Sequence, residues 1–387
     1  MERKNAWAAY AGDDGKVEAF AKAYCDFINN GKTERECVAY GEKLAKAHGF
    51  EDLNAVVRSG RKLEAGARVY ANWMGKSFML FVLGEKPLEE GMNILGAHID
   101  SPRIDVKQNP LYEDTDLAYL DTHYYGGIKK YQWVAIPLAL HGVIVRKTGE
   151  KVIINIGEDE NDPVFCISDL LVHLAQEQMT KNAKEVVEGE ALNLIVGGRP
   201  LEGEEKDAVK ANVLKLLADK YGVEEEDFLS AELEIVPAGK ARDMGFDRSM
   251  ILAYGHDDRV CAYPSMMAVL DYEGTPEYTL CCIVTDKEEI GSVGATGMAS
   301  HYLENTVAEL YACTADYCEL AVRRCLRNSR MLSSDVSAGY DPNFASAFEK
   351  KNSAFLGRGI CFNKFTGSRG KSGSNDANPE FMASLRK

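Results

Sequence analysis

Four groups of acidic and histidine residues in this sequence are of the types that bind divalent metal ions. They are His98 with Asp100, Asp257 with Asp258, Glu288 with Glu289, and Asp335. Each group stands beside a short apolar run that reads as a buried strand, and open α/β sheets bind ligands beyond the ends of their strands. Several carboxylates buried together need a compensating charge, which a metal ion supplies. Histidine with carboxylates and no cysteine suits Zn, Mn or Co at a hydrolytic site.

Each group also has an ordinary structural interpretation. A His-x-Asp pair occurs by chance in many chains. Asp257 and Asp258 could cap a helix and form a local ion pair with Arg259. Glu288 and Glu289 could open a helix for the same dipole reason, and a lone aspartate after a strand could cap a turn. The four groups are informative together, because each follows a predicted buried strand.

The elements that would position these residues alternate between strands and helices. Apolar residues spaced by three and four predict helices over 17–30 and 33–47. Short apolar runs predict buried strands at 77–84, 93–100, 278–286 and 308–316, and further helices are predicted over 257–271, 292–304 and 316–327. This alternation indicates an α/β fold with a mostly parallel sheet and helices on both faces.

A stretch rich in predicted strands separates the two parts of the chain in which strands and helices alternate. Strand-like runs at 119–127, 134–145 and 151–157 are followed by predicted helices over 165–180 and 205–222. The simplest account is one α/β catalytic domain interrupted by an inserted β-rich domain. We therefore expect the catalytic domain in residues 1–105 and 245–387 and the inserted domain in residues 106–244.

Composition excludes several classes of protein. The chain has 387 residues and a formal net charge of −15, which argues against nucleic acid or an anionic membrane as the main partner. Its 45% hydrophobic content is enough to build a core. The ten cysteines show no CxxC spacing, so neither a zinc ribbon nor a disulfide framework is indicated. No stretch approaches the roughly 18 apolar residues of a membrane span, and we expect a cytoplasmic protein.

Five segments resemble the M18 family of metallo-aminopeptidases, the group of aspartyl aminopeptidase and aminopeptidase I. They are GAHIDSPR (96–103), HYYGG (123–127), HDDR (256–259), DKEEIGSVGATG (286–297) and SSDVSAGYDPNF (333–344). The segments occur in the family's order, and the similarity extends over essentially the whole chain. The resemblance implies a catalytic domain like those of the two-zinc exopeptidases.

The resemblance also implies a role for each matching residue. The implied metal ligands are His98, Asp257, Glu289 and Asp335, with Asp257 bridging two divalent ions, zinc or else cobalt or manganese. Asp100 would orient the imidazole of His98. Glu288 would be the general base, and the peptide bond between Asp257 and Asp258 is expected to be cis.

The implied reaction is removal of the N-terminal residue from small peptides. Glu288 would take a proton from a metal-bridged water and return it to the departing amine. The free amino group of the substrate would bind a metal ion or an acidic side chain, which would make the enzyme an exopeptidase.

Two further residues concern partners and specificity. His173 matches a histidine that reaches a neighbouring subunit in the family, which implies a homo-oligomer built from dimers, up to a dodecamer. Its alternative is a histidine on a helix face. Lys364, with Arg369 and Lys371 nearby, is the candidate for binding an acidic first residue, and its alternative is a solvated lysine on a Gly/Ser-rich loop. The apolar segment YQWVAIPLAL (131–140) replaces a more charged one of aspartyl aminopeptidases and favours a broader preference that includes neutral residues.

One ligand of the family pattern has no counterpart here. The family's last metal-binding histidine lies in a C-terminal segment, whereas no histidine of this chain follows His301. We therefore expect four of the five ligand positions and a catalytic domain without its C-terminal end. The second hypothesis is a catalytically silent relative that acts as a scaffold or interaction subunit. The presence of Asp100, Asp257 and Glu288 favours the enzyme, because a scaffold needs no general base.

Overall fold

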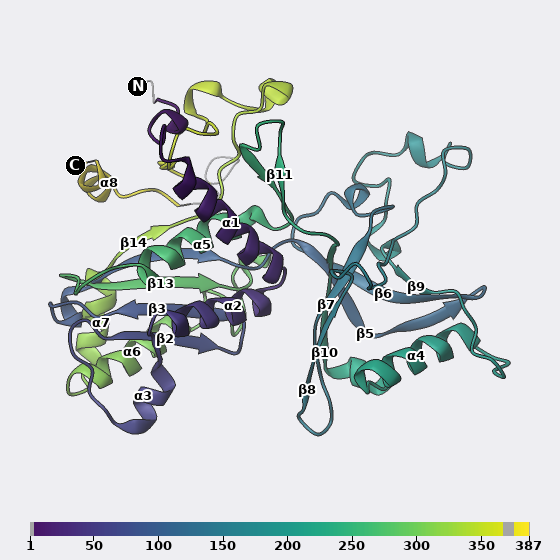
Figure 1. The fold of residues 1–387 in the computed structure, drawn as a ribbon, viewed down its shortest axis with the longest axis horizontal. Coiled ribbons are helices and arrows are strands. Elements are labelled where there is room, and N and C mark those ends of the chain that lie inside the picture. The colour runs from purple at the N-terminus through teal and green to yellow at the C-terminus, as the bar shows by residue number, and fades with distance from the viewer. Residues whose placement is uncertain (1–3, 367–374, 387) are drawn as a thin grey trace. The chain divides into compact units, whose positions relative to one another are not determined.

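The computed structural model describes residues 4–366 and 375–386. The chain forms two compact units, Lys22–Asp335 and a smaller one made of Met1–Ala21 with Val336–Lys387. The larger unit contains two six-stranded sheets and a two-stranded one (Figure 1). All four groups of predicted metal ligands belong to this unit. No helix in the described part of the chain is both long and apolar enough to cross a membrane.

The first sheet has six strands in the order β1-β2-β3-β13-β4-β14. Their bounds are β1 Glu51–Asp52, β2 Arg68–Trp73, β3 Ser77–Val82, β4 Met92–His98, β13 Thr279–Thr285 and β14 Arg330–Ser333. The strands β13, β4 and β14 are mutually parallel, as are β1 and β2. The pairs β2–β3 and β3–β13 are antiparallel. The predicted mostly parallel sheet is therefore mixed, because β2 and β3 form a hairpin through a tight turn rather than a crossover.

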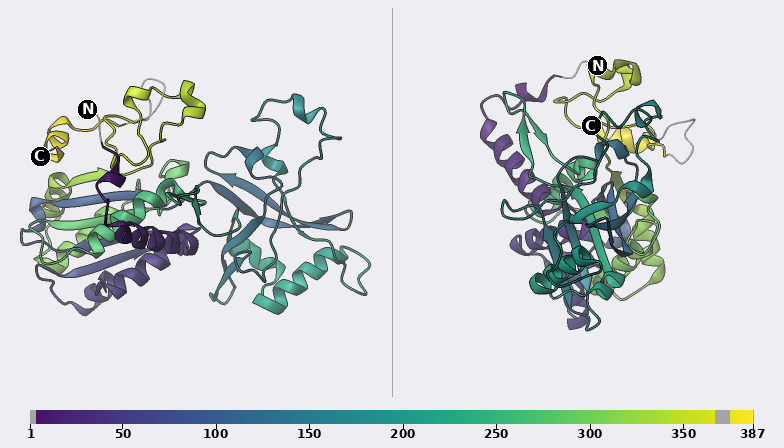
Figure 2. Two further views of the ribbon diagram at one scale, coloured as in Figure 1. Left: turned by 45° about the horizontal axis from the view of Figure 1, so that its top comes forward. Right: turned by 90° about the vertical axis from the view of Figure 1, so that its right-hand side faces the viewer.

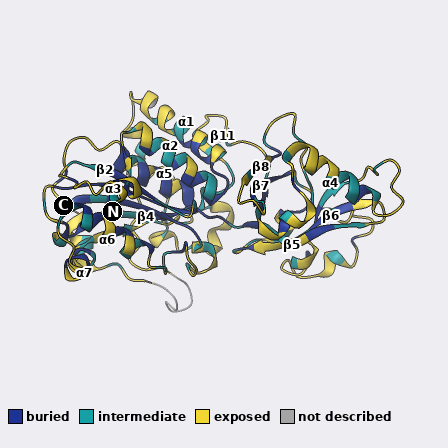
Figure 3. Cartoon of the chain, turned by 90° about the horizontal axis from the view of Figure 1, so that it is seen from below, coloured by how far each residue is buried: buried dark blue, intermediate teal, exposed yellow. Residues whose placement is uncertain are grey.

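Helices cover both faces of this sheet, as Figure 2 shows from two further directions. One face carries α1 (Asp14–Asn30), α2 (Glu34–Ala47) and α5 (His256–Leu270), and the other carries α3 (Leu53–Ser59), α6 (Tyr302–Thr314) and α7 (Glu319–Asn328). Strand β3 shows why two faces form: Phe78, Leu80 and Val82 pack in one core cluster, and Met79 and Phe81 in the other. Side chains alternate across a strand, so a fully apolar run serves both faces. Figure 3 shows these strands mainly in the colour of buried residues.

Local signals explain several helix boundaries. Thr33 caps α2 through a capping box with Glu36. Asp52 accepts a hydrogen bond from the backbone of Asn54 at the start of α3, and Gly60, in the left-handed conformation, ends that helix.

The predictions over 292–304 and 308–316 are wrong. Residues 308–316 were predicted as a strand, but α6 runs through most of them, and no helix covers 292–301. Val307, Leu310 and Tyr311 are buried at helical spacing. A short apolar run does not by itself distinguish a strand from a buried helix, which explains the error.

The second sheet is antiparallel and uses residues between Arg103 and Pro237. Its strand order is β8-β7-β10-β5-β6-β9. The bounds are β5 Arg103–Asp114, β6 Leu117–Tyr125, β7 Leu138–Val145, β8 Lys151–Ile156, β9 Leu194–Gly197 and β10 Ala231–Pro237. Helix α4 (Ala208–Tyr221) shares its core, and a separate hairpin follows from β11 (Arg242–Met244) and β12 (Met250–Leu252).

The predicted helix over 165–180 does not form. This segment is irregular apart from one 3-10 turn, Gln178–Thr180. Leu170, Leu171, Val172 and Leu174 are each more than half exposed. A helix in water depends on packing one apolar face against a core, and these exposed side chains pack against none in the described part of the chain.

The smaller unit consists mainly of turns. It contains the 3-10 helices Ala6–Ala8, Pro342–Ala347 and Lys350–Asn352, and the helix α8 (Pro379–Leu385). The backbone amide of Ala6 donates to the carbonyl of Gly357 at 2.6 Å. The ring of Tyr340 packs against Phe348 and Phe355. Contacts between the two ends of the chain therefore define this unit.

Candidate metal centre

The predicted ligands lie at the carboxyl ends of adjacent parallel strands. His98 is the last residue of β4 and is paired in register with Thr285, the last residue of β13. Glu288 and Glu289 follow β13, and Asp335 follows β14. Because β13, β4 and β14 are parallel neighbours, these side chains meet at one edge of the sheet.

Asp257 and Asp258 enter the site from the start of α5. The peptide bond between them is cis, as the family resemblance implied, and both residues have non-helical backbone angles. The residue that caps α5 is Gly255, without a side-chain hydrogen bond. Regular helical angles begin after Asp258, so the acidic pair stands at the N-terminal end of the regular part of α5. The side chain of Asp258 accepts a hydrogen bond from the backbone amide of His98 at 3.4 Å.

The imidazole of His98 is the common point of the cluster. Its Nε2 atom lies 3.2 Å from Asp257 Oδ1 and 3.7 Å from Glu288 Oε2. The same atom lies 3.9 Å from Asp335 Oδ1. Two triplets have possible ligand atoms all within 4.8 Å of one another, His98–Asp257–Glu289 and His98–Asp258–Asp335. All four predicted ligands therefore belong to one or the other triplet.

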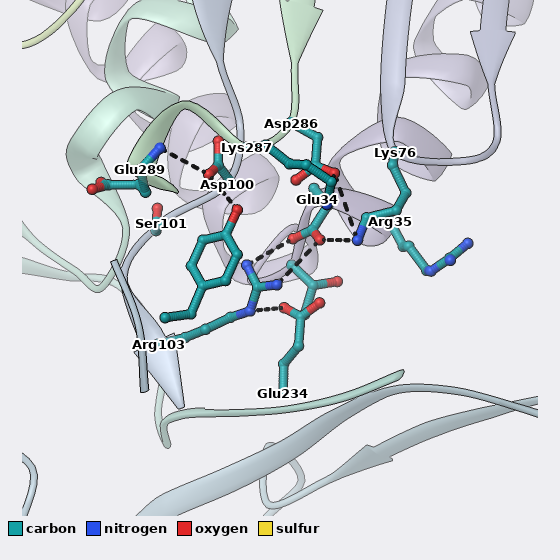
Figure 4. A network of polar contacts seen from close by, with 12 residues as sticks. Glu34, Arg35, Lys76, Asp100, Ser101, Arg103, Glu234, Asp286, Lys287 and Glu289 are labelled. Carbon is teal, nitrogen blue, oxygen red and sulfur yellow. Dashed lines mark hydrogen bonds and ion pairs between the residues drawn. The ribbon is translucent and has the colours of Figure 1, made fainter. Parts of the chain in front are cut away.

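Asp100 is fully buried and holds this arrangement together. His98 Nδ1 lies 3.2 Å from Asp100 Oδ1 and 3.0 Å from the Asp100 carbonyl oxygen. The backbone amide of Glu288 donates to Asp100 Oδ1 at 3.2 Å. That of Glu289 donates to Asp100 Oδ2, also at 3.2 Å (Figure 4). The hydroxyl of Tyr125 donates to Oδ2 at 2.8 Å. Asp100 thus contacts a predicted ligand, the candidate base and the second sheet at once.

The crowded carboxylates give the site a strongly negative potential. Burial and neighbouring carboxylates raise the pKa of Asp258 and of Glu289 to about 7. The pKa of Glu288 is also raised, chiefly by burial. Burial alone would lower the pKa of His98, but its contacts with Asp100 and Asp257 outweigh burial and raise it to about 11. Each of these shifts indicates that the site favours an added positive charge.

Unsatisfied buried atoms indicate the same requirement. In the described part of the chain, His98 Nε2, Asp257 Oδ1 and Asp258 Oδ1 are buried without a hydrogen bond of acceptable geometry. Buried polar atoms without partners are rare and costly in folded proteins. A divalent cation would satisfy all three atoms, and imidazole with carboxylate oxygens is a suitable donor set for zinc. The residues present therefore fit a metal centre.

The two substrate-binding candidates belong to other segments of the chain. His173 is exposed in a turn of the segment between β8 and β9, and no described contact joins it to the His98 cluster. Lys364 belongs to the smaller unit, where its carbonyl oxygen accepts a hydrogen bond from the amide of Ala377 at 2.8 Å. Arg369 and Lys371 lie outside the described residues.

Asp258 and Tyr125 contribute to the site, but the sequence had assigned no role to either residue. Asp258 stands next to Asp257 in the sequence. The expected cis peptide bond between the two residues was the one indication that the side chain of Asp258 could also enter the site. Tyr125 lies in the HYYGG segment, but no local pattern indicates that the end of β6 reaches Asp100. That contact depends on how the second sheet meets the first.

Comparisons with known proteins agree with this geometry. The family model described as Aminopeptidase I zinc metalloprotease (M18) matches residues 27–386. The chain is 58% identical over 390 residues to the probable M18 family aminopeptidase 1 of Clostridium acetobutylicum, with 100% of this chain and 83% of that protein covered.

Solved structures show the same similarity in three dimensions. The crystal structure of aminopeptidase I from C. acetobutylicum matches with a TM-score of 0.90 at 55% identity. That of an M18 family aminopeptidase from Thermotoga maritima matches with a TM-score of 0.93 at 42% identity. Each comparison covers 100% of this chain and 84% of the other. The cluster around His98, the matched motifs and these relatives show that the chain belongs to the M18 family of metallo-aminopeptidases, which are hydrolytic exopeptidases.

Proposed function

We propose that this protein removes the N-terminal residue of small peptides with Glu288 as the general base. The observation that carries this proposal is the position of Glu288 Oε2, 3.7 Å from His98 Nε2 but outside both ligand triplets. A base must lie beside the ligands without being one of them. The raised pKa of Glu288 makes it a stronger base than an ordinary carboxylate.

The proposed ligands are His98, Asp257, Glu289 and Asp335, holding two divalent ions. Nε2 of His98 has one lone pair and would bind one ion, while the carboxylates of Asp257, Glu289 and Asp335 are available to hold a second. The family description supports zinc, with cobalt or manganese as alternatives. Such ions polarise a substrate carbonyl and acidify water. Asp100 fixes the tautomer and the direction of His98, so that Nε2 is available to the ion.

The remaining steps are assigned to side chains of this chain. Glu288 accepts a proton from the attacking water and delivers it to the leaving amine, because the same carboxylate faces both. The acidic cluster also attracts the positively charged amino group of a free N-terminus. A peptide with a blocked amino group lacks that charge, which accounts for exopeptidase action.

We propose an acidic or broader neutral first-residue preference. Lys364 is the proposed partner of an acidic first side chain, and the apolar segment 131–140 favours neutral residues as well. Substrates with Asp, Glu or Leu first are therefore expected to be cleaved faster than those with Lys first.

We also propose that residues 106–244 form an inserted domain that joins subunits of a homo-oligomer. The exposed apolar side chains of Leu170, Leu171, Val172 and Leu174 support this, because such a patch is costly in water. His173 lies among them and would be the residue offered to a neighbouring subunit. A structural neighbour with 21% identity, mApe1 of S. cerevisiae, is described as a dodecamer.

The experiment is a peptide panel with Asp, Glu, Leu, Lys or a blocked amine at the first position. Release of the first residue is measured with no metal and with added Zn, Co or Mn. Metal-dependent release from the free peptides, and none from the blocked peptide, supports the proposal. No release with any metal contradicts it and leaves the silent scaffold as the better account.

A further inference from the structure

We propose that Tyr125 is a positioning residue of the metal centre, acting through Asp100. Its hydroxyl fixes the Asp100 carboxylate, which in turn orients His98. The expected effect of Tyr125 on activity rests on the proposed function. The expected effect of Tyr125 on metal affinity does not depend on that function.

The contacts of Asp100 show what the hydroxyl adds. An ionised carboxylate has about four lone-pair sites. The backbone amides of Glu288 and Glu289 each donate to one of its oxygens at 3.2 Å, and His98 Nδ1 lies 3.2 Å from Oδ1. Tyr125 makes the fourth and shortest contact, at 2.8 Å. Because the site is then full, the carboxylate has one orientation that satisfies every partner.

Tyr125 comes from a different sheet than the residues it serves. It is the last residue of β6, whereas His98 ends β4 and the glutamates follow β13. The side chain is 8% exposed, and burial raises its pKa well above the usual range, so the hydroxyl stays protonated and donates. The second sheet therefore contributes a hydrogen-bond donor to the centre built on the first.

The ring of Tyr125 is itself held in place. The guanidinium of Arg103 lies 3.8 Å from the ring centroid, a cation–π contact. Arg103 in turn pairs with Glu34 and Glu234 inside the protein (Figure 4). A ring fixed in this way directs its hydroxyl along one line, which is what a positioning residue requires.

The next residue makes a second contact with the centre. Gly126 has a φ of +72°, and a Cβ placed there would lie 3.2 Å from Cβ of Glu289 and 3.4 Å from its Oε2. Gly126, directly after β6, thus lies close to the proposed ligand Glu289, while Tyr125 donates a hydrogen bond to Asp100. Two independent contacts by neighbouring residues favour a role in the site over ordinary core packing.

The test compares Tyr125→Phe with a matched control on the same strand. Tyr125→Phe removes the hydroxyl and keeps the ring and its contact with Arg103. Tyr124→Phe is the control, because Tyr124 points to the opposite face of the strand and is 39% exposed. The affinity of each protein for Zn and Co is measured by competition with a chromophoric chelator. The geometry of the Co site is followed by the visible absorption spectrum of the Co-loaded protein.

We expect Tyr125→Phe to weaken metal binding about tenfold, at the low end of the 10–100-fold typical for residues that support ligands. The cobalt spectrum should shift, and kcat should fall more than KM rises. Tyr124→Phe should match the wild type in all three. Both variants are checked for the wild-type circular dichroism spectrum.

A double-mutant cycle tests the route through Asp100. In an Asp100→Ala background, Tyr125→Phe should change metal affinity less than twofold, because the acceptor of its hydrogen bond is gone. Equal effects in both backgrounds would overturn the proposal, as would wild-type metal affinity in Tyr125→Phe. If the wild type binds metal but releases no residue from any peptide, the proposed function fails, and the affinity comparison still decides the role of Tyr125.

Discussion

Arg103 Nη1 lies 3.3 Å from Glu34 Oε2, and this buried ion pair ties β5 of the second sheet to α2 on the first. Lys76 Nζ joins the network at 2.7 Å from Glu34 Oε1 and 3.6 Å from Asp286 Oδ2 (Figure 4). Asp286 lies two residues before Glu288, so the network runs from the second sheet to the segment that carries the proposed base. Glu34, Glu232 and Glu234 would otherwise resemble a cation site, but Lys76 and Arg103 already supply its positive charge.

Arg103→Met is expected to destabilise the protein strongly. Removing one partner of a buried ion pair leaves uncompensated charge, at a cost of about 3–5 kcal/mol. Thermal or denaturant unfolding should therefore show a clearly lower midpoint. Lys147→Ala, which breaks an exposed pair with Glu226, is the control and should leave the midpoint unchanged. Equal midpoints for Arg103→Met and the wild type would contradict the structural role of the network.

His141 should make stability depend on pH. Its Nδ1 lies 2.8 Å from Glu36 and its Nε2 lies 3.2 Å from Glu158, which Lys32 also contacts at 2.5 Å. Burial lowers the pKa of His141, but the two glutamates outweigh burial and raise it above 6.5. A raised pKa adds stability that is fully present below about pH 6.5 and is lost as pH rises through the folded-state value.

The free energy of unfolding of the wild type is therefore compared with that of His141→Gln across this range. The difference should be largest near pH 6 and narrow toward pH 9. Thr148→Ala, an exposed substitution without a titratable group, is the control and should give a difference that does not change with pH. If the difference in free energy of unfolding between the wild type and His141→Gln grew with rising pH, the pKa of His141 would be lowered rather than raised in the folded protein. That result would contradict this prediction.

Gly126→Ala should impair catalysis more than folding. Its φ of +72° disfavours a side chain, at about 1–2 kcal/mol, and the new Cβ would displace Glu289. We expect kcat/KM to fall by roughly tenfold or more, since a misplaced ligand weakens the metal centre. Gly127→Ala is the matched control, because no atom lies within 4 Å of a Cβ there. Equal activity in the two variants would argue against close contact between β6 and Glu289.

Zinc should stabilise the folded protein. The carboxylates around His98 repel one another, so a bound cation relieves that repulsion and adds about 2.7 kcal/mol at a free concentration of 100 times Kd. The melting temperature should rise with added zinc after chelation and rise much less in Asp257→Asn. An equal rise in both proteins would place the stabilising ion elsewhere.

The sequence was most informative where chemistry and strands coincide. His98 and Glu288 belong to short apolar runs, or follow them, that were predicted as strands and form β4 and β13, whereas no range was predicted for β14, before Asp335. The parallel pairing of the three strands brings the side chains together. The capping box of Thr33 likewise made the start of α2 predictable. These features depend on local patterns and on a general rule for parallel sheets.

The failures have tertiary causes. Residues 165–180 have a helical pattern without a core to pack against, and residues 308–314 have an apolar run that suits a strand or a buried helix equally. Tyr125 was undetectable as a site residue, because its contact with Asp100 joins two sheets and no spacing along the chain encodes it. Partial errors in the elements left the candidate site intact, since its residues lie at strand ends and at the start of α5 rather than within the misassigned segments.

The most direct test of the proposed mechanism is Glu288→Gln, compared with the wild type and with Glu273→Gln at an exposed loop position. Glu288→Gln should keep zinc affinity within a few-fold, because Glu288 is no proposed ligand, and should lose about 10²–10⁴-fold in kcat for release of the first residue. Glu273→Gln should match the wild type. Metal-dependent release by Glu288→Gln at the wild-type rate would contradict the assignment of Glu288 as the general base.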